Sequence, residues 1–252
     1  MGIFREVISL LYIISCRAGL SGPLLFFLGG RFVGVRVECM NFNYQHSRPS
    51  YFTQRDLDVA YVVSRHIILM SSQIKALGLP VRRLGHMVKY GFLFRYCLTF
   101  RDGTYWNAYA IGHTARRLLG LPVVGISNPS KVHSMLLVNQ VLIHFLSKVS
   151  DVSIEVNFHH PVQAVVTVNN PLGVCAPRRG FDRTYLSRHN ILQAIVVLPE
   201  RSMISSGLPV RYCFDDEMDD PFNLVFYQCL SGMRLEPVDL FGSSTADDVA
   251  SS

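Results

Sequence analysis

The chain has 252 residues, of which 49% are hydrophobic and only 17% charged. This composition excludes a disordered protein and predicts a folded one, much of whose surface is covered by a partner or a membrane. Its net charge of +6 hides a strong asymmetry: 23 Lys and Arg stand against 9 Asp and Glu up to Cys213, and 1 against 9 beyond it. Because only four of the 24 basic residues are Lys, the basic body is rich in Arg and predicts a polyanion partner.

The first 39 residues differ from the rest. Residues 7–30 are apolar, but an Arg, two Gly and a Pro interrupt them, so the run of about 20 apolar residues that a membrane helix needs is absent. Residues 1–37 hold four Arg and one acidic residue, which is typical of an organellar presequence. We therefore expect a mitochondrial presequence over residues 1–39. A membrane anchor in this segment, or translation that begins at Met40, are the alternatives.

An α/β core is predicted over residues 40–150. Thr53 can cap a helix, and Asp56 stands three residues later, where it can bond back to the cap residue. Apolar residues at helical spacing extend this predicted helix to Gly78, which with the following proline ends it.

The chain from Arg95 has the pattern of a β-α-β unit. The predicted elements are a strand at 95–100, a turn at 101–104, a helix at 105–119 ended by Gly120, a strand at 122–126 and a helix from Pro129. Parallel strands joined by a right-handed crossover would form a Rossmann-like three-layer β-α-β core.

One face of the predicted helix 105–119 is apolar. Its side chains recur every three or four residues, at Ala108, Ile111, Ala115 and Leu118. Arg116 and Arg117 lie away from this stripe, so we expect them to face solvent or a partner. Leu118, in contrast, is expected in the core, where a charge would unfold the domain.

After residue 150 short β-rich runs alternate with turns rich in Pro, Asn and Gly. This pattern predicts a mostly β segment over residues 151–232, which could extend the first sheet or form its own. Residues 233–252 form an acidic tail, and their composition predicts partial disorder.

No motif of a common enzyme class is present. A phosphate-binding loop, a dinucleotide fingerprint, a nucleophile elbow and a zinc-protease helix are all missing from the sequence. His159-His160 and the acidic run 215–220 lack the spacing of a metal site, and Cys175 has no base at a defined spacing. The six cysteines lie far apart and lack the regular spacing of a disulfide framework, which favours reduced thiols in a reducing compartment. We expect no catalytic residue, metal or cofactor.

Basic residues accumulate in predicted loops and at helix ends, among aromatic residues. Arginine can stack on bases and bridge phosphates, so this pattern favours RNA contact; the alternative is a core of aromatic residues with arginines that only solvate the surface. The RNA-contacting residues that we predict are Arg82, Arg83, Lys89, Arg95, Arg101, Arg116, Arg117, Lys131, Arg178 and Arg179.

Residues 96–131, about 35 of the 252, resemble a β-α-β unit of the small-subunit ribosomal protein S-two family. In that family a helix with the pattern A-x-x-L-G-[IL]-P-V-V-G-I leads into a polar turn. The matching residues are Ala115, Leu118, Gly120, Leu121, Pro122, Val123, Val124, Gly125 and Ile126, with Asn128 where the family has its turn asparagine. The turn aspartate and the earlier Gly-Thr-Lys strand of the family are missing.

Together with the presequence-like start and the bias toward Arg, the resemblance implies a non-enzymatic structural protein of a mitochondrial small ribosomal subunit, located in the matrix. Its partners would be ribosomal RNA and neighbouring proteins. Two alternatives stay open. One is an accessory subunit of a mitochondrial inner-membrane complex, anchored by residues 7–30; the other is an orphan Rossmann-like enzyme with its site near residues 101–104 and 127–130.

Overall fold

The computed structural model describes residues 24–25, 32–38, 52–100, 105–121, 129–157, 162–177, 193–204, 208, 210–218, 220–230 and 234–241. The chain divides into two compact units, Met1–Asn139 and Gln140–Ser252, with the division inside helix α6 (Pro129–Lys148). Unit 1 has 16 Lys and Arg against 5 acidic residues, whereas unit 2 has 8 against 13. The basic excess of the chain therefore lies in unit 1. Both units mix helices and strands, which confirms the α/β class.

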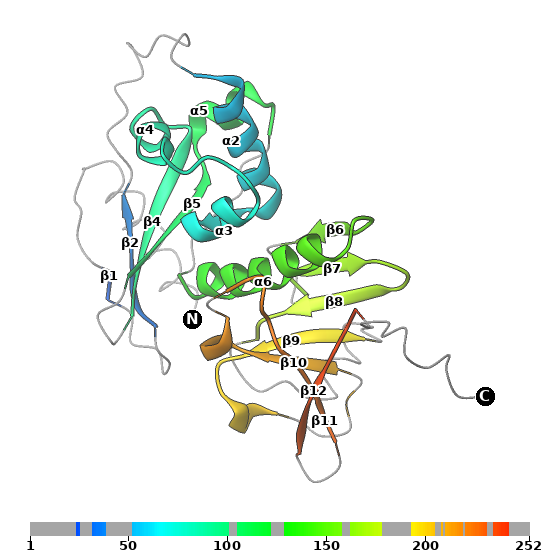
Figure 1. Cartoon of the computed structure of the whole chain (residues 1–252). Helices are drawn as coiled ribbons and strands as arrows, with labels where there is room; N and C mark the ends of the chain where they lie inside the picture. The colour runs from blue at the N-terminus through cyan, green and yellow to red at the C-terminus, as the bar shows by residue number, and fades with distance from the viewer. Residues whose placement is uncertain are drawn as a thin grey trace, which may run out of the picture. The chain divides into compact units, whose positions relative to one another are not determined.

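A five-stranded antiparallel sheet forms the centre of unit 1 (Figure 1). Its order is β1-β2-β4-β5-β3, with β1 at Leu24–Leu25, β2 at Phe32–Glu38, β3 at Ile68–Met70, β4 at Leu93–Phe100 and β5 at Tyr105–Ile111. Strand β2 falls within the range 1–39 assigned above to a leader, and it pairs with β4 from one end to the other.

The predicted β-α-β unit is wrong in its first half. Tyr105–Ile111 is a strand rather than a helix, and it pairs antiparallel with β4 from Leu93↔Ile111 to Thr99↔Tyr105. Helix α5 (His113–Leu118) takes up only the end of the predicted helix, and the strand expected at 122–126 lies outside the described residues. Every pairing between described strands of unit 1 is antiparallel, so no Rossmann-like crossover forms among them.

Helix α2 (Gln54–His66) begins where the sequence predicts it. Thr53 is the N-cap, and the Asp56 carboxylate accepts a hydrogen bond from the Thr53 backbone N–H at 2.9 Å, which forms a capping box. This is a purely local signal, because the donor and the acceptor are three residues apart.

The same helix ends at His66 rather than at Gly78. Ile67 has a φ of 68°, in the left-handed region, and the chain continues as β3 and then as α3 (Ser71–Ala76). The Asn139 side-chain amide donates hydrogen bonds to the carbonyls of His66 and Ile68. It thereby satisfies backbone carbonyls that have no helical partner where the helix ends.

Gly78 and Gly120 end helices as predicted, but Gly78 ends α3 and not the long helix that the sequence suggested. Their φ values of 75° and 65° are readily adopted only by glycine. Helix α4 (Leu84–Lys89) follows Gly78 and leads into β4.

Unit 2 contains a seven-stranded mixed sheet of its own, in the order β12-β11-β10-β9-β8-β7-β6 (Figure 1). The predicted β-rich runs, at residues 153–158, 164–169, 191–199, 209–214 and 223–230, overlap β6 (Ser153–Val156), β7 (Ala164–Thr167), β9 (Ala194–Leu198), β10 (Val210–Phe214) and β11 (Phe226–Cys229). The sequence analysis missed β8 (Pro171–Cys175) and β12 (Leu235–Val238). Strands β8, β9 and β10 are parallel to one another, and the other pairs are antiparallel.

Both faces of the middle of this sheet are buried. On one face Val196, Tyr212 and Phe214 belong to a core cluster with residues around the 3-10 helix η2 (Arg201–Met203). The alternate positions Val197 and Cys213 are also 1% exposed, and side chains alternate between the faces of a strand. Continuous apolar runs such as β9 are the consequence.

Helix α6 runs from Pro129 as predicted, and its buried positions include polar residues. Within unit 2 the Gln140 amide donates to the carbonyl of Met218 at 2.8 Å, and His144 Nδ1 donates to the carbonyl of Pro221 at 2.9 Å. None of the helices in the described ranges has the length and apolarity needed to cross a membrane.

Candidate nucleic-acid interface

Aromatic rings join the start of α2 to helix α4. Phe52 stacks on Phe92 with ring centroids 3.6 Å apart, and it lies 5.7 Å from His86 and 5.8 Å from Tyr90. His86 and Tyr90 also contact each other, with centroids 4.5 Å apart. Such a cluster buries a large apolar area and fixes the two helical segments against one another.

Helix α5 is attached to the turn that follows α4 through backbone hydrogen bonds. The Gly112 N–H donates to the Phe92 carbonyl at 2.7 Å, and the Thr114 N–H donates to the Gly91 carbonyl at 3.0 Å. The Thr114 hydroxyl also donates to the carbonyl of Tyr90 at 3.1 Å. A Cβ atom on Gly112 would lie 2.2 Å from the Gly91 oxygen, so the approach requires a residue without a side chain.

An ion pair between a buried carboxylate and a partly exposed guanidinium connects α2 with the residue before α4. Asp56 is 1% exposed, and its two carboxylate oxygens accept hydrogen bonds from Arg83 Nε and from one terminal nitrogen, both at 2.9 Å. Burial acts to raise the pKa of Asp56, but the hydrogen bonds from the Thr53 backbone and from Arg83 outweigh it, so the pKa lies below its usual value. Arg83 is therefore committed to a structural contact.

Five other basic residues lie in the first turn of α2, directly before and at the end of α4, and in α5. We refer to them as the α2–α4–α5 edge, which comprises Arg55, Arg82, Lys89, Arg116 and Arg117. All are exposed except the half-buried Arg116, and the Lys89 ammonium lies 5.6 Å from the centroid of the Tyr90 ring. Sequence reasoning missed Arg55, although its place directly before Asp56, in the first turn of a helix with a recognised cap, was a usable signal.

Of the remaining predicted RNA-contacting residues, the two that the structure describes lie in other elements. Arg95 is half-buried in β4, where its register partners are Glu38 on β2 and Tyr109 on β5. Lys131 is half-buried in the first turns of α6. Arg101, Arg178 and Arg179 lie outside the described residues.

The reason first given for placing Arg116 and Arg117 on the surface is wrong. Ala108 and Ile111 belong to a strand, so they do not form a helical stripe with Leu118, which is 61% exposed. A charge at Leu118 would therefore not be buried, and the expectation that it would unfold the domain is withdrawn.

Cys175 and the described part of the acidic run have other roles, and His159 and His160 lie outside the described residues. Cys175 is fully buried, and burial raises its pKa to about 12, so it does not provide a nucleophilic thiolate. In the acidic run, Glu217 and Asp216 form ion pairs with Arg201, whose guanidinium also lies 4.5 Å from the centroid of the Phe214 ring. No group of three or more His, Cys, Asp or Glu with the arrangement of a metal site occurs within the described ranges.

No family model, curated protein or solved structure matches this chain. The resemblance of residues 96–131 to the ribosomal family stays a prediction. Its first half falls on strands β4 and β5 where the family has a strand and a helix.

Proposed function

We propose that this protein contacts RNA through the α2–α4–α5 edge, as a structural component of a ribonucleoprotein. The observation that supports this most is the concentration of five basic residues on three short segments that buried contacts hold together. Asp56, the buried acidic residue that follows Arg55, is already neutralised by Arg83, and the exposed Asp58 accepts a hydrogen bond from Gln54. An anion that approaches the edge is therefore not repelled by the Asp56 carboxylate.

The chemistry of the edge suits phosphate contacts rather than base recognition. Four of its five members are Arg, which can bridge phosphate oxygens with two parallel hydrogen bonds. Contacts of this kind position a protein on RNA with little dependence on base sequence. The Lys89–Tyr90 pair adds an aromatic ring on which an unpaired base could stack.

We propose the mitochondrial small ribosomal subunit as the particle. The Arg-rich first 37 residues and the resemblance of residues 96–131 favour it. Purification of the endogenous protein at low salt, followed by identification of the RNA and proteins that accompany it, tests this assignment. Recovery with an inner-membrane complex and no RNA would contradict it.

The RNA proposal predicts a salt-dependent affinity that falls when the edge is neutralised. In the full chain, Arg82→Gln combined with Lys89→Gln and Arg117→Gln should weaken binding of a single-stranded RNA and reduce the slope of log affinity against log salt. Because each neutralised phosphate contributes about 0.7 to that slope, the loss should approach about 2. Fluorescence anisotropy with a labelled RNA between low and physiological salt measures both quantities.

The matched control removes two exposed charges elsewhere in unit 1. Arg65 lies in the last turn of α2 and Lys75 in α3, so Arg65→Gln with Lys75→Gln lowers the net charge of the unit without touching the edge. We expect its slope to stay close to that of the wild type. The edge variant removes three charges and the control two, so if both lose the same affinity per charge removed, the binding follows net charge alone and the edge is not the contact surface.

A further inference from the structure

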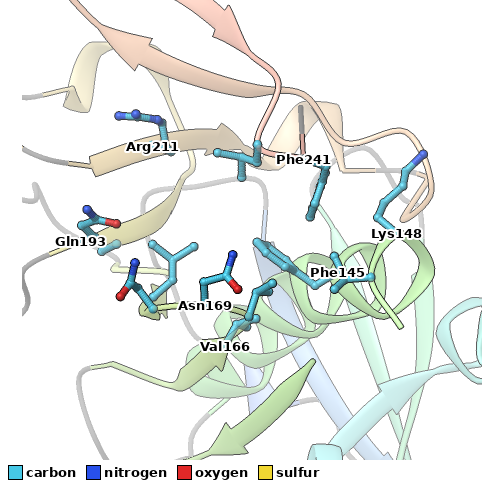
Figure 2. Close-up of a pocket in the computed structure, with 13 residues that line it drawn as sticks. Phe145, Lys148, Val166, Asn169, Gln193, Arg211 and Phe241 are labelled. Atoms are coloured by element: carbon cyan, nitrogen blue, oxygen red, sulfur yellow. The ribbon is translucent and has the colours of Figure 1, made fainter. Parts of the chain in front are cut away.

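A cavity of about 510 Å³ lies in unit 2, on the edge of the sheet where the parallel strands β8, β9 and β10 begin. Its walls are the last turns of α6, strand β7 and the turn into β8, the first residues of β9 and β10, and the chain after β12 (Figure 2). The volume lies in the range of small-molecule sites. The RNA proposal makes no use of this cavity.

Apolar side chains form one part of the lining. Phe145 of α6 and Phe241 meet edge to face, with ring centroids 5.0 Å apart. Val166 and Leu172 stand opposite each other in the β7–β8 register, and Val166 is 1% exposed. A ring or a short apolar chain of a ligand could lie against these groups and lose its contact with water.

Polar side chains that can donate hydrogen bonds form the other part. Figure 2 shows Arg211 and Gln193 on one side of the cavity and Lys148 on the other, with Asn169 between them and both phenylalanines toward Lys148. None of the thirteen described residues that line the cavity is acidic, although unit 2 holds 13 acidic residues against 8 basic ones. The cavity is thus a positively charged site within a negatively charged unit.

The two cations of the cavity differ in their surroundings. Lys148 lies in the last turn of α6, where the negative end of the helix dipole, about half a charge, partly offsets it. Arg211 lies near the start of a strand, and a sheet has only a small net dipole. The uncompensated positive charge is therefore on the Arg211 side, where Figure 2 also shows the amide side chain of Gln193.

We propose that this cavity binds a small amphipathic anion. Arg211, Gln193 and Asn169 would hold a carboxylate or phosphate group, and the apolar part of the molecule would lie against Phe145 and Phe241. The arrangement explains why cationic and amide side chains share one cavity with an apolar wall.

The test uses the full chain and three probes that share a benzene ring: benzoate, phenyl phosphate and neutral benzyl alcohol. Isothermal titration calorimetry should show that at least one of the two anions binds about tenfold or more tightly than benzyl alcohol, because a hydrogen-bonded charge contributes at least that factor. Arg211→Gln should remove this advantage and leave benzyl alcohol unchanged. Phe241→Ala should weaken all three probes. The tighter of the two anions identifies the preferred head group.

Two further variants keep the result interpretable. Arg234→Gln removes an exposed charge of unit 2 outside the cavity and should change nothing. Asn169→Asp places a carboxylate on the exposed turn between β7 and β8, where it does not disturb the core, and should repel both anions even if Arg211→Gln lowers stability. The proposal is overturned if no probe binds at millimolar concentration, if benzyl alcohol binds as tightly as both anions, or if Asn169→Asp binds the anions like the wild type.

Discussion

Gly112→Ala is expected to destabilise unit 1 by about 3 kcal/mol, because the added methyl group collides with backbone and not with a movable side chain. Its Cβ would lie 2.2 Å from the Gly91 oxygen and 2.7 Å from the Phe92 carbonyl carbon. To relieve the collision α5 must move away from the turn after α4. That movement breaks the hydrogen bond from Gly112 to Phe92 and stretches the one from Thr114 to Gly91. Urea denaturation followed by circular dichroism measures the loss.

Gly85→Ala is the matched control, because the same chemical change is made where nothing opposes it. Gly85 is exposed within α4, and an added Cβ would have no atom within 4 Å. We expect a gain of about 0.5 to 1 kcal/mol, since alanine loses less backbone entropy in a helix than glycine. Equal effects of the two substitutions would show that Gly112 is not held by close packing.

The comparison of sequence with structure separates local signals from long-range ones. The start of α2 was predictable because Thr53 and Asp56 form a capping box within four residues of the chain. The end of the same helix was not, because Ile68–Met70 is an apolar run that suits a helix or a strand equally. Its pairing with β5, some forty positions away, decides between the two.

Strand β5 shows the same difficulty in a stronger form. Ala108, Ile111 and Ala115 recur at helical spacing, but the first two lie on a strand whose partner is β4. An Asp-Gly pair between two aromatic-rich runs is a hairpin signal, and it was available at residues 102–103. The helical periodicity and the turn thus predict different structures for residues 105–111, and the parallel crossover depends on the helical one.

The candidate site was predictable in its charge and not in its geometry. The basic character of unit 1 and four of the five edge residues, Arg82, Lys89, Arg116 and Arg117, follow from the sequence. The role of Arg83 does not, because its partner Asp56 is 27 residues away and becomes buried only when α2 and α4 pack together. The cavity of unit 2 is lined by five separate chain segments, so no local sequence pattern could predict it.

Arg83→Met is expected to destabilise unit 1 by about 3 kcal/mol at neutral pH, whereas Asp56→Asn should cost only about 1 to 2 kcal/mol. The asymmetry follows from exposure: the side chain of Asp56 is 2% exposed and that of Arg83 is 41% exposed. Without Arg83 the carboxylate stays buried with an uncompensated charge. Without the Asp56 charge, the guanidinium can turn toward water. The exposed neighbour Arg82 is the control, and Arg82→Met should stay within about 0.5 kcal/mol of the wild type.

The pH dependence distinguishes an electrostatic cost from lost packing. In the folded wild type the pKa of Asp56 is lowered, so its contribution to stability is complete above the unfolded value of about 3.9 and is lost as the pH falls through the folded value. Arg83→Met removes one of the groups that lower this pKa and leaves burial, which raises it. As the pH falls, the carboxyl group of the variant is therefore protonated before that of the wild type, and the stability difference between them should shrink. Urea titrations at pH 7 and pH 3 measure the difference; an equal cost at both pH values would mean that Arg83 stabilises α2 and α4 through its aliphatic stem and not through its charge.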